Sequence, residues 1–194
     1  MPGNQSRGRL LVPTLLALLF VGPFATAIGL YFWGGDGWRP QGSVAHGILI
    51  EDPSSLDIGP VALPDGSSTG FTGKWSLLQV GNGNCETACQ RSLYEVRQVR
   101  QALGKEMSRV QRFFIATSGT PDTEFMRSTH PDLMVIDNSG PAGGRVLAAL
   151  GAFSEEDVFV VDPLGNIMMR FPAGTSMKDM HKDLSLLLKA STIG

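Results

Sequence analysis

The sequence has little charge and no excess of either sign. Only 18% of its 194 residues are Asp, Glu, Lys or Arg, and the formal net charge is -2. Nucleic-acid-binding domains usually carry a strongly basic surface, so this balance gives no reason to expect nucleic acid as a partner. Internal repeats of roughly 20–50 residues are also absent. Apolar residues make up 42% of the chain, which is enough for a folded core and argues against general disorder.

Charge is missing altogether from one long stretch near the N-terminus. The 24 residues from Leu10 to Trp33 contain no Asp, Glu, Lys or Arg, and about 20 apolar residues are enough to cross a bilayer as a helix. A cleaved signal peptide is the alternative, because Ala25-Thr26-Ala27 resembles a cleavage site. The apolar run continues past that site, however, so we expect an uncleaved, single-pass transmembrane helix over residues 10–33.

The charges that flank this helix predict its orientation. Residues 1–9 carry Arg7 and Arg9 and no acid, whereas Asp36 and Glu51 follow on the far side. The basic side of a span normally stays in the cytoplasm. We therefore expect a cytoplasmic N-terminal tail, an anchor in a bacterial inner membrane, and a C-terminal domain in the periplasm, where cysteine pairs can be oxidised.

Beyond the anchor, the pattern predicts a linker and N-terminal extension over residues 34–71 and one α/β domain over residues 72–194. Apolar runs predict strands, apolar residues at helical spacing predict helices, and Asp162-Pro163-Leu164-Gly165 predicts a hairpin turn. The order is β-α-β-α-β, a hairpin and a last helix, which is a thioredoxin-like central sheet with helices on both faces. The expected strands cover 75–80, 110–117, 133–136, 158–161 and 166–171, and the expected helices follow Cys85 to about 103, then cover 121–129 and 176–191, with a helical turn at 145–150.

The chain contains only two cysteines, Cys85 and Cys89, between the first strand and the first helix of this domain. A helix N-terminus favours thiolate over thiol. Cysteines four apart on a helical turn have Cα atoms about 6 Å apart, which suits a disulfide or two thiolates closing on Cu(I). We expect Cys85 to be more exposed and to attack first, with Cys89 resolving the mixed disulfide. A purely structural disulfide, or two buried thiols, is the alternative.

The remaining candidate ligands are few. His46, His130 and His181 are predicted to be surface or locally hydrogen-bonded residues, and none is expected to bind metal. Met168 and Met169 alternate along a strand, so they are predicted to pack in the core.

From Gly73 onward the chain resembles the Sco/SenC branch of thioredoxin-like proteins. The resemblance is carried by GKWSLL, by the Cys-x3-Cys pair in CETACQRSLYEVRQVRQALGKEM, by VFVVDPLGNIMMRF and by the basic, Leu-rich end DLSLLLKASTIG. Within this branch it looks like the small membrane-anchored proteins found with cytochrome c oxidase assembly genes in proteobacteria. The resemblance implies a role in maturing the copper centre of cytochrome c oxidase, with copper as the metal and an oxidase subunit or another assembly factor as the partner.

Two departures from the Sco pattern bear on this expectation. Glu86 and Gln90 follow the two cysteines, where copper-binding Sco proteins usually have proline. Ser154 occupies the position of the family's histidine ligand. Two hypotheses follow: a membrane-tethered thiol–disulfide oxidoreductase or copper assembly factor that acts through Cys85 and Cys89, and a non-enzymatic assembly or docking subunit that kept the fold without full copper binding.

Overall fold

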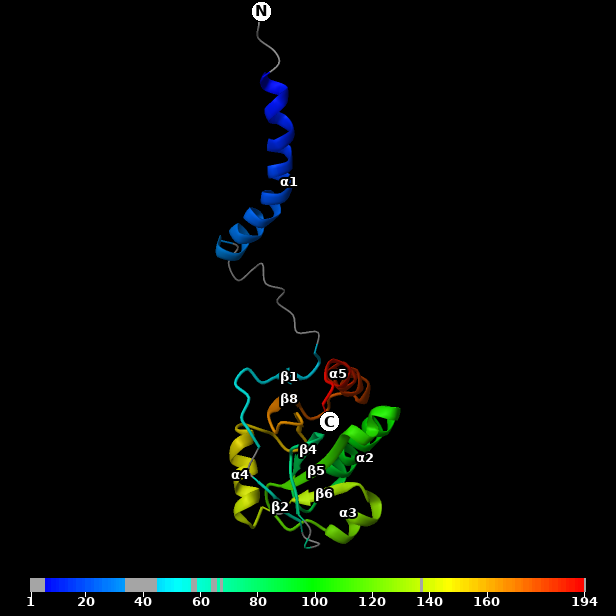
Figure 1. Ribbon diagram of the computed structural model, residues 1–194. Coiled ribbons are helices and arrows are strands. Elements are labelled where there is room, and N and C mark those ends of the chain that lie inside the picture. Colours follow the sequence, from blue (N-terminus) through cyan, green and yellow to red (C-terminus); the bar gives the residue numbers. More distant parts are fainter. Residues whose placement is uncertain are drawn as a thin grey trace, which may run out of the picture. The chain divides into compact units, whose positions relative to one another are not determined.

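The computed structural model describes residues 6–33, 45–56, 59–63, 66, 68–136 and 138–193. It divides into two units, Met1–Val44 and Ala45–Gly194. The first unit contains helix α1 (Ser6–Trp33, Figure 1), whose stretch Pro13–Phe32 is long and apolar enough to cross a membrane. The predicted anchor is therefore a helix. The first part of the predicted linker, residues 34–44, lies outside the described residues.

The second unit is built on a six-stranded sheet in the order β1-β8-β7-β4-β5-β6 (Figure 1). Strands β4, β5 and β6 run parallel, whereas β7, β8 and β1 each run antiparallel to their neighbour. The strands are β1 (Ile48–Leu49), β4 (Trp75–Gly81), β5 (Val110–Ala116), β6 (Leu133–Ile136), β7 (Val158–Val161) and β8 (Ile167–Phe171). A separate pair, β2 (Val61–Ala62) and β3 (Ser68–Thr69), forms a short antiparallel ribbon.

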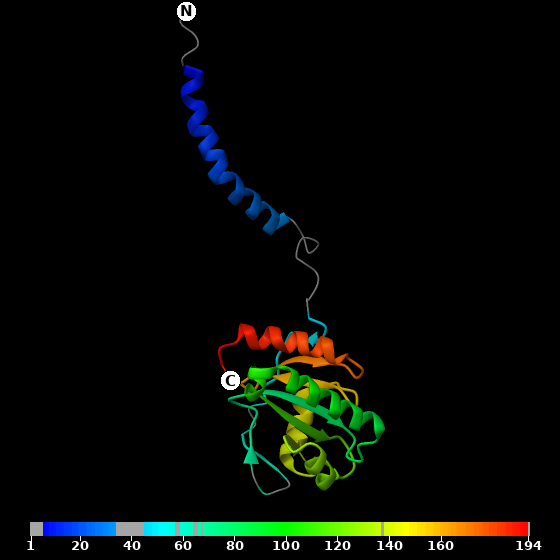
Figure 2. The same ribbon diagram turned by 90° about the vertical axis from the view of Figure 1, so that its right-hand side faces the viewer.

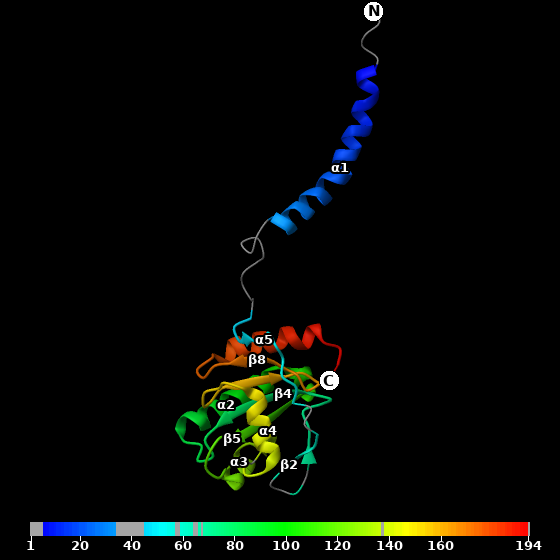
Figure 3. The same cartoon turned by 90° about the vertical axis from the view of Figure 1, so that its left-hand side faces the viewer.

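Helices cover both faces of the sheet, as the apolar strands require. The helices are α2 (Thr87–Ala102), the 3-10 helix η2 (Gly104–Arg109), α3 (Thr123–Thr129), α4 (Pro141–Leu150) and α5 (Met177–Ala190). Val96 of α2 and Leu184 of α5 pack with Leu77 on one face (Figure 2), and Val146 of α4 packs with Leu78 on the other (Figure 3). The predicted thioredoxin-like α/β fold is confirmed.

One helix is longer than the sequence suggested. Residues 145–150 were expected to form a single turn, but α4 has ten residues and begins with Pro141. Gly143 and Gly144 lower the helix propensity of its first half, which conceals the helix in the sequence. Proline is compatible with the first helical position because its missing N–H has no partner there anyway.

The compact unit begins at Ala45, well before the predicted domain boundary at residue 72. Leu56, Val61 and Phe71 are buried in the core on the α4 side of the sheet, and the Phe71 ring lies 4.5 Å from the Phe113 ring. Strand β1 adds to the sheet edge beside β8. Much of the expected N-terminal extension is therefore packed against the thioredoxin-like core.

Candidate functional site

The two cysteines come together as the sequence predicts. Cys85 and Cys89 form a disulfide with Cα atoms 5.0 Å apart. Helix α2 begins at Thr87, so Cys85 lies just before the helix and Cys89 lies in its first turn. This places the sulfur pair at the positive end of the helix dipole, where a thiolate is stabilised after reduction.

A tight turn between β4 and α2 positions Cys85. Its N–H donates to the Asn82 carbonyl over 3.0 Å, and the Asn82 side chain accepts from the Asn84 N–H over 3.0 Å. Cys85 has φ of +41°, in the left-handed region that non-glycine residues rarely adopt. The Gln90 side chain donates to the Cys85 carbonyl over 3.0 Å and ties this turn to the first turn of α2.

The two cysteines are almost equally buried, with 3% of Cys85 and 2% of Cys89 exposed. The expectation that Cys85 is the more exposed residue is therefore wrong for this disulfide state. Both residues belong to an apolar cluster with Leu93, Phe114 and Met126. The turn folds Cys85 back onto this cluster, which shields the residue from solvent.

Loops that follow β5 and precede β7 meet at the same end of the sheet. Gly83 N–H donates to the Ser118 carbonyl over 2.7 Å, and Glu156 N–H donates to the Val80 carbonyl over 2.8 Å. A Cβ on Gly83 would lie 2.9 Å from the Gly119 backbone, so only glycine fits this loop contact. The disulfide thus lies at the carboxyl ends of the parallel strands, where α/β folds commonly place their chemistry.

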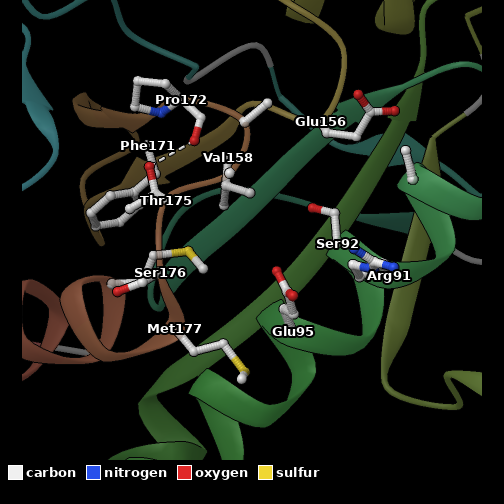
Figure 4. Close-up of a pocket in the computed structure, with 14 residues that line it drawn as sticks. Arg91, Ser92, Glu95, Glu156, Val158, Phe171, Pro172, Thr175, Ser176 and Met177 are labelled. Carbon is white, nitrogen blue, oxygen red and sulfur yellow. Dashed lines mark hydrogen bonds between the residues drawn. The ribbon is translucent and has the colours of Figure 1, made fainter.

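A cavity of about 510 Å³ lies beside the start of α2. Ala88, which lies between the two cysteines in sequence, is part of its wall. Figure 4 shows Arg91, Ser92 and Glu95 of α2 on one side, with Phe171, Pro172, Thr175 and Met177 on the other. Glu156 also lines this cavity, and burial together with the charges of Glu155 and Asp157 raises its pKa. The cavity therefore combines an apolar wall with ionisable groups next to the cysteine pair.

The side chains present do not fit a three-ligand copper site. Ser154 is exposed, and its N–H donates to the Asp157 carboxylate over 2.8 Å. A hydroxyl is not a substitute for the nitrogen ligand that Cu(II) prefers. Among the described residues, no three His, Cys, Asp or Glu side chains come together as metal ligands. Two thiolates, released by reduction, are the soft donors that the cysteine pair offers.

The three histidines have different environments. His46 lies 3.0 Å from Asp183 and 3.3 Å from Asp179, and His181 lies 3.2 Å from the Ala102 carbonyl, so both are locally hydrogen-bonded as expected. His130 was also predicted to be a surface or locally hydrogen-bonded residue, but it does not lie at the surface, because its side chain is buried. Burial, with the charges of Arg112 and Arg97, lowers the pKa of His130.

Sequence reasoning missed the burial of two large polar side chains in the central strands, Arg112 and Gln79. Arg112 of β5 is 1% exposed, donates to the Leu93 carbonyl over 2.8 Å, and pairs with Asp132 at 3.3 Å. Burial lowers the pKa of Arg112 to about 10. Gln79 of β4 is equally buried. A polar residue inside a strand that is otherwise mostly apolar is the signal that could have identified both.

Comparison with known proteins supports the fold. A family model described as transmembrane-like, thioredoxin-like, C-terminal domain matches residues 75–191. Apo Sco1 from Thermus thermophilus is 19% identical with a TM-score of 0.57, and the match covers 77% of this chain and 99% of that one. Copper-bound ScoI from Bradyrhizobium japonicum is 20% identical with a TM-score of 0.52, and the match covers 72% of this chain and 97% of that one. A putative thioredoxin from Neisseria meningitidis is 12% identical with a TM-score of 0.57, and the match covers 73% of this chain and 94% of that one. No curated protein matches the sequence.

Proposed function

The chain belongs to the family of transmembrane-like, thioredoxin-like C-terminal domains, and from this premise we propose that it is a membrane-tethered thiol–disulfide exchange factor. The observation that carries the proposal is the Cys85–Cys89 disulfide at the N-terminus of α2. The helix terminus stabilises thiolate, which is the form that exchanges with disulfides. A short-range bridge across four positions also restricts the unfolded chain little, so structural stabilisation is a weak reason for its presence.

The exchange uses the two sulfurs in sequence. In the reduced protein, the Cys85 thiolate attacks one sulfur of a partner disulfide, and the partner's other sulfur leaves as a thiolate. The Cys89 thiolate then attacks the Cys85 sulfur, and the second partner sulfur leaves. Two electrons pass to the partner, whose thiolates take up protons from water, and the Cys85–Cys89 disulfide of the present structure is the product.

The partner expected from the Sco resemblance is a cytochrome c oxidase subunit or another assembly factor, exposed to the periplasm. Three features support this choice: the apolar helix α1, the fold shared with Sco proteins, and the cysteine pair at the end of the sheet. The cavity beside Ala88 gives the partner chain an apolar wall next to its target bond. In this role the protein prepares cysteines of the oxidase subunit for copper.

A second candidate function is favoured by the missing imidazole. Ser154 stands at the expected ligand position, and the described part of the chain has no other group of three ligands. These residues favour a docking or assembly subunit, because such a subunit uses the fold and does not require a bound metal. Copper would then reach this protein at most as Cu(I) cargo on two thiolates.

Redox titration of the purified full chain in detergent separates these functions. The protein is equilibrated with mixtures of reduced and oxidised glutathione, alkylated, and its blocked thiols are counted by mass spectrometry. An exchange factor should show a midpoint within the range that glutathione mixtures cover. A pair that stays closed under a large excess of reduced glutathione would behave as a structural disulfide and would contradict the proposal. Repeating the titration with Cu(I) shows whether the reduced pair takes metal.

A further inference from the structure

Gln79 lies in the middle of β4 with its side chain sealed inside the protein. It is 1% exposed, and neither its Nε2 nor its Oε1 has a hydrogen-bond partner among the described residues. Its neighbours across the sheet are Phe114 on β5 and Val158 on β7, which offer no polar side-chain atoms. Buried carboxamides are almost always hydrogen-bonded, so this one requires an explanation.

The position of Gln79 relative to the disulfide supplies one. Side chains alternate along a strand, so Gln79 projects from the same face of β4 as Gly81. A Cβ placed on Gly81 would lie 3.6 Å from the Cys89 sulfur and 2.9 Å from the ring of Phe114, the neighbour of Gln79 on β5. The Cys89 sulfur therefore lies over Gly81, and Gln79 stands two residues back, about 6.6 Å along the strand. An extended glutamine side chain is long enough to close most of that gap.

We propose that Gln79 stabilises the thiolate of Cys89 when the disulfide is reduced, by donating a hydrogen bond from its Nε2–H group to the Cys89 sulfur. A disulfide sulfur is neutral and a weak acceptor, and the Gln79 carboxamide has no hydrogen-bond partner while the bridge is closed. A thiolate is a charged acceptor, and hydrogen bonds to charged groups are the stronger ones. The stabilised Cys89 thiolate is the group that resolves the mixed disulfide on Cys85.

This assignment rests on the proposed thiol–disulfide function and adds a residue to it. The carboxamide of Gln79 is neutral throughout the physiological pH range, so it donates to the thiolate and takes no proton from the thiol. The Cys89 proton therefore passes to water when the turn opens. The hydrogen bond lowers the pKa of Cys89 and raises the fraction of attacking thiolate.

The test isolates Cys89 from its partner sulfur. In full-length protein carrying Cys85→Ser, purified in detergent, the pKa of the Cys89 thiol is read from the ultraviolet absorbance of the thiolate. Adding Gln79→Met should raise that pKa by about one unit, a tenfold loss of thiolate at a fixed pH below the pKa. Gln79→Leu should act in the same direction.

A matched control comes from Gln111 on the neighbouring strand. Its side chain donates to the Gly70 carbonyl over 3.0 Å and to the Ser76 hydroxyl over 2.9 Å, so it has partners unrelated to the cysteines. Gln111→Met should lower thermal stability and leave the Cys89 pKa unchanged. A Cys89 pKa that stays unchanged in both Gln79 variants would overturn the proposal.

Thermal denaturation of the oxidised protein tests whether Gln79 has a purely structural role. With Cys85 and Cys89 intact and bridged, Gln79→Met should be at least as stable as the wild type, because an unpartnered carboxamide is lost. Unfolding of both oxidised Gln79 variants would show that the side chain supports the fold and would contradict the assignment. Both readouts are made without a partner, so they are independent of whether a partner disulfide is found.

Discussion

Asp183 should be a major source of stability where the chain enters the compact unit. It lies on α5, is 2% exposed, and its carboxylate accepts from the His46 N–H over 2.6 Å and from the Gly47 N–H over 2.9 Å. The other oxygen lies 3.0 Å from the His46 ring. This one carboxylate therefore holds the segment that leads from residue 45 into β1 against α5.

The expected cost of removing this carboxylate follows from the groups that it leaves behind. Asp183→Ala deprives two backbone N–H groups of their acceptor, that of Gly47 buried and that of His46 partly buried, and an unsatisfied buried group costs about 1–3 kcal/mol. A total near 3 kcal/mol is expected. In a unit that spans 150 residues, each kcal/mol shifts the melting temperature by about 2–4 °C, so the Tm should fall by roughly 6–12 °C.

The assay is circular-dichroism melting of the full chain in detergent, with Asp179→Ala as the matched control. Asp179 faces the same His46 ring at 3.3 Å, but its side chain is 37% exposed, and exposed ion pairs contribute at most about 1 kcal/mol. Asp183→Ala should therefore lose several times more stability than Asp179→Ala. Equal losses, or a Tm within 1–2 °C of the wild type for Asp183→Ala, would refute the account of this junction.

Three further predictions concern acid stability, copper and topology. The pKa of His130 is lowered by burial, so its stabilising contribution is full above its ordinary value of 6.5 and is lost as the pH falls through the folded value. His130→Phe should therefore flatten the dependence of unfolding free energy on pH below 6.5 by up to about 1.4 kcal/mol per pH unit in urea titrations, and equal slopes would contradict this. The wild type should form no stable one-to-one Cu(II) complex, whereas Ser154→His should strengthen Cu(II) binding measured by titration; tight wild-type binding would show that a ligand was misassigned. A C-terminal alkaline phosphatase fusion should be active, because the positive charges of Arg7 and Arg9 favour a cytoplasmic N-terminus; activity of a cytoplasm-only reporter there would overturn the orientation.

The regular elements of the core were predictable because each leaves a local pattern. The buried strands read as apolar runs, as in LMVI of β6 and VFVV of β7, and α5 repeats its apolar residues at helical spacing. The position of Cys85 and Cys89 between a strand and a helix was enough to predict their approach. These features depend on neighbours in sequence, which is why they are visible without a structure.

The features that were missed depend on tertiary contacts. Leu56, Val61 and Phe71 are isolated apolar residues between turn signals, and only the packed sheet shows that they belong to the core. Cys85 is buried in a turn where its backbone is left-handed, and the residue types of the turn do not predict this conformation for a cysteine. In the sequence, Gln79 is a polar residue in a mostly apolar strand. Its relation to the cysteine pair can be inferred only once the structure shows the Cys89 sulfur over Gly81.

Trapping of a mixed disulfide in cells tests the central claim most directly. With Cys89→Ser, the resolving sulfur is gone, so Cys85 should remain bound to its partner, and the adduct should be visible on non-reducing gels and vanish on reduction. Cys85→Ser should trap far less, because Cys89 lies within the first turn of α2, whereas Cys85 lies in the turn that precedes the helix. The account predicts an adduct that contains an oxidase subunit or another assembly factor. No adduct from either variant, with normal stability and oxidase activity in both, would contradict thiol–disulfide exchange and leave the docking function in its place.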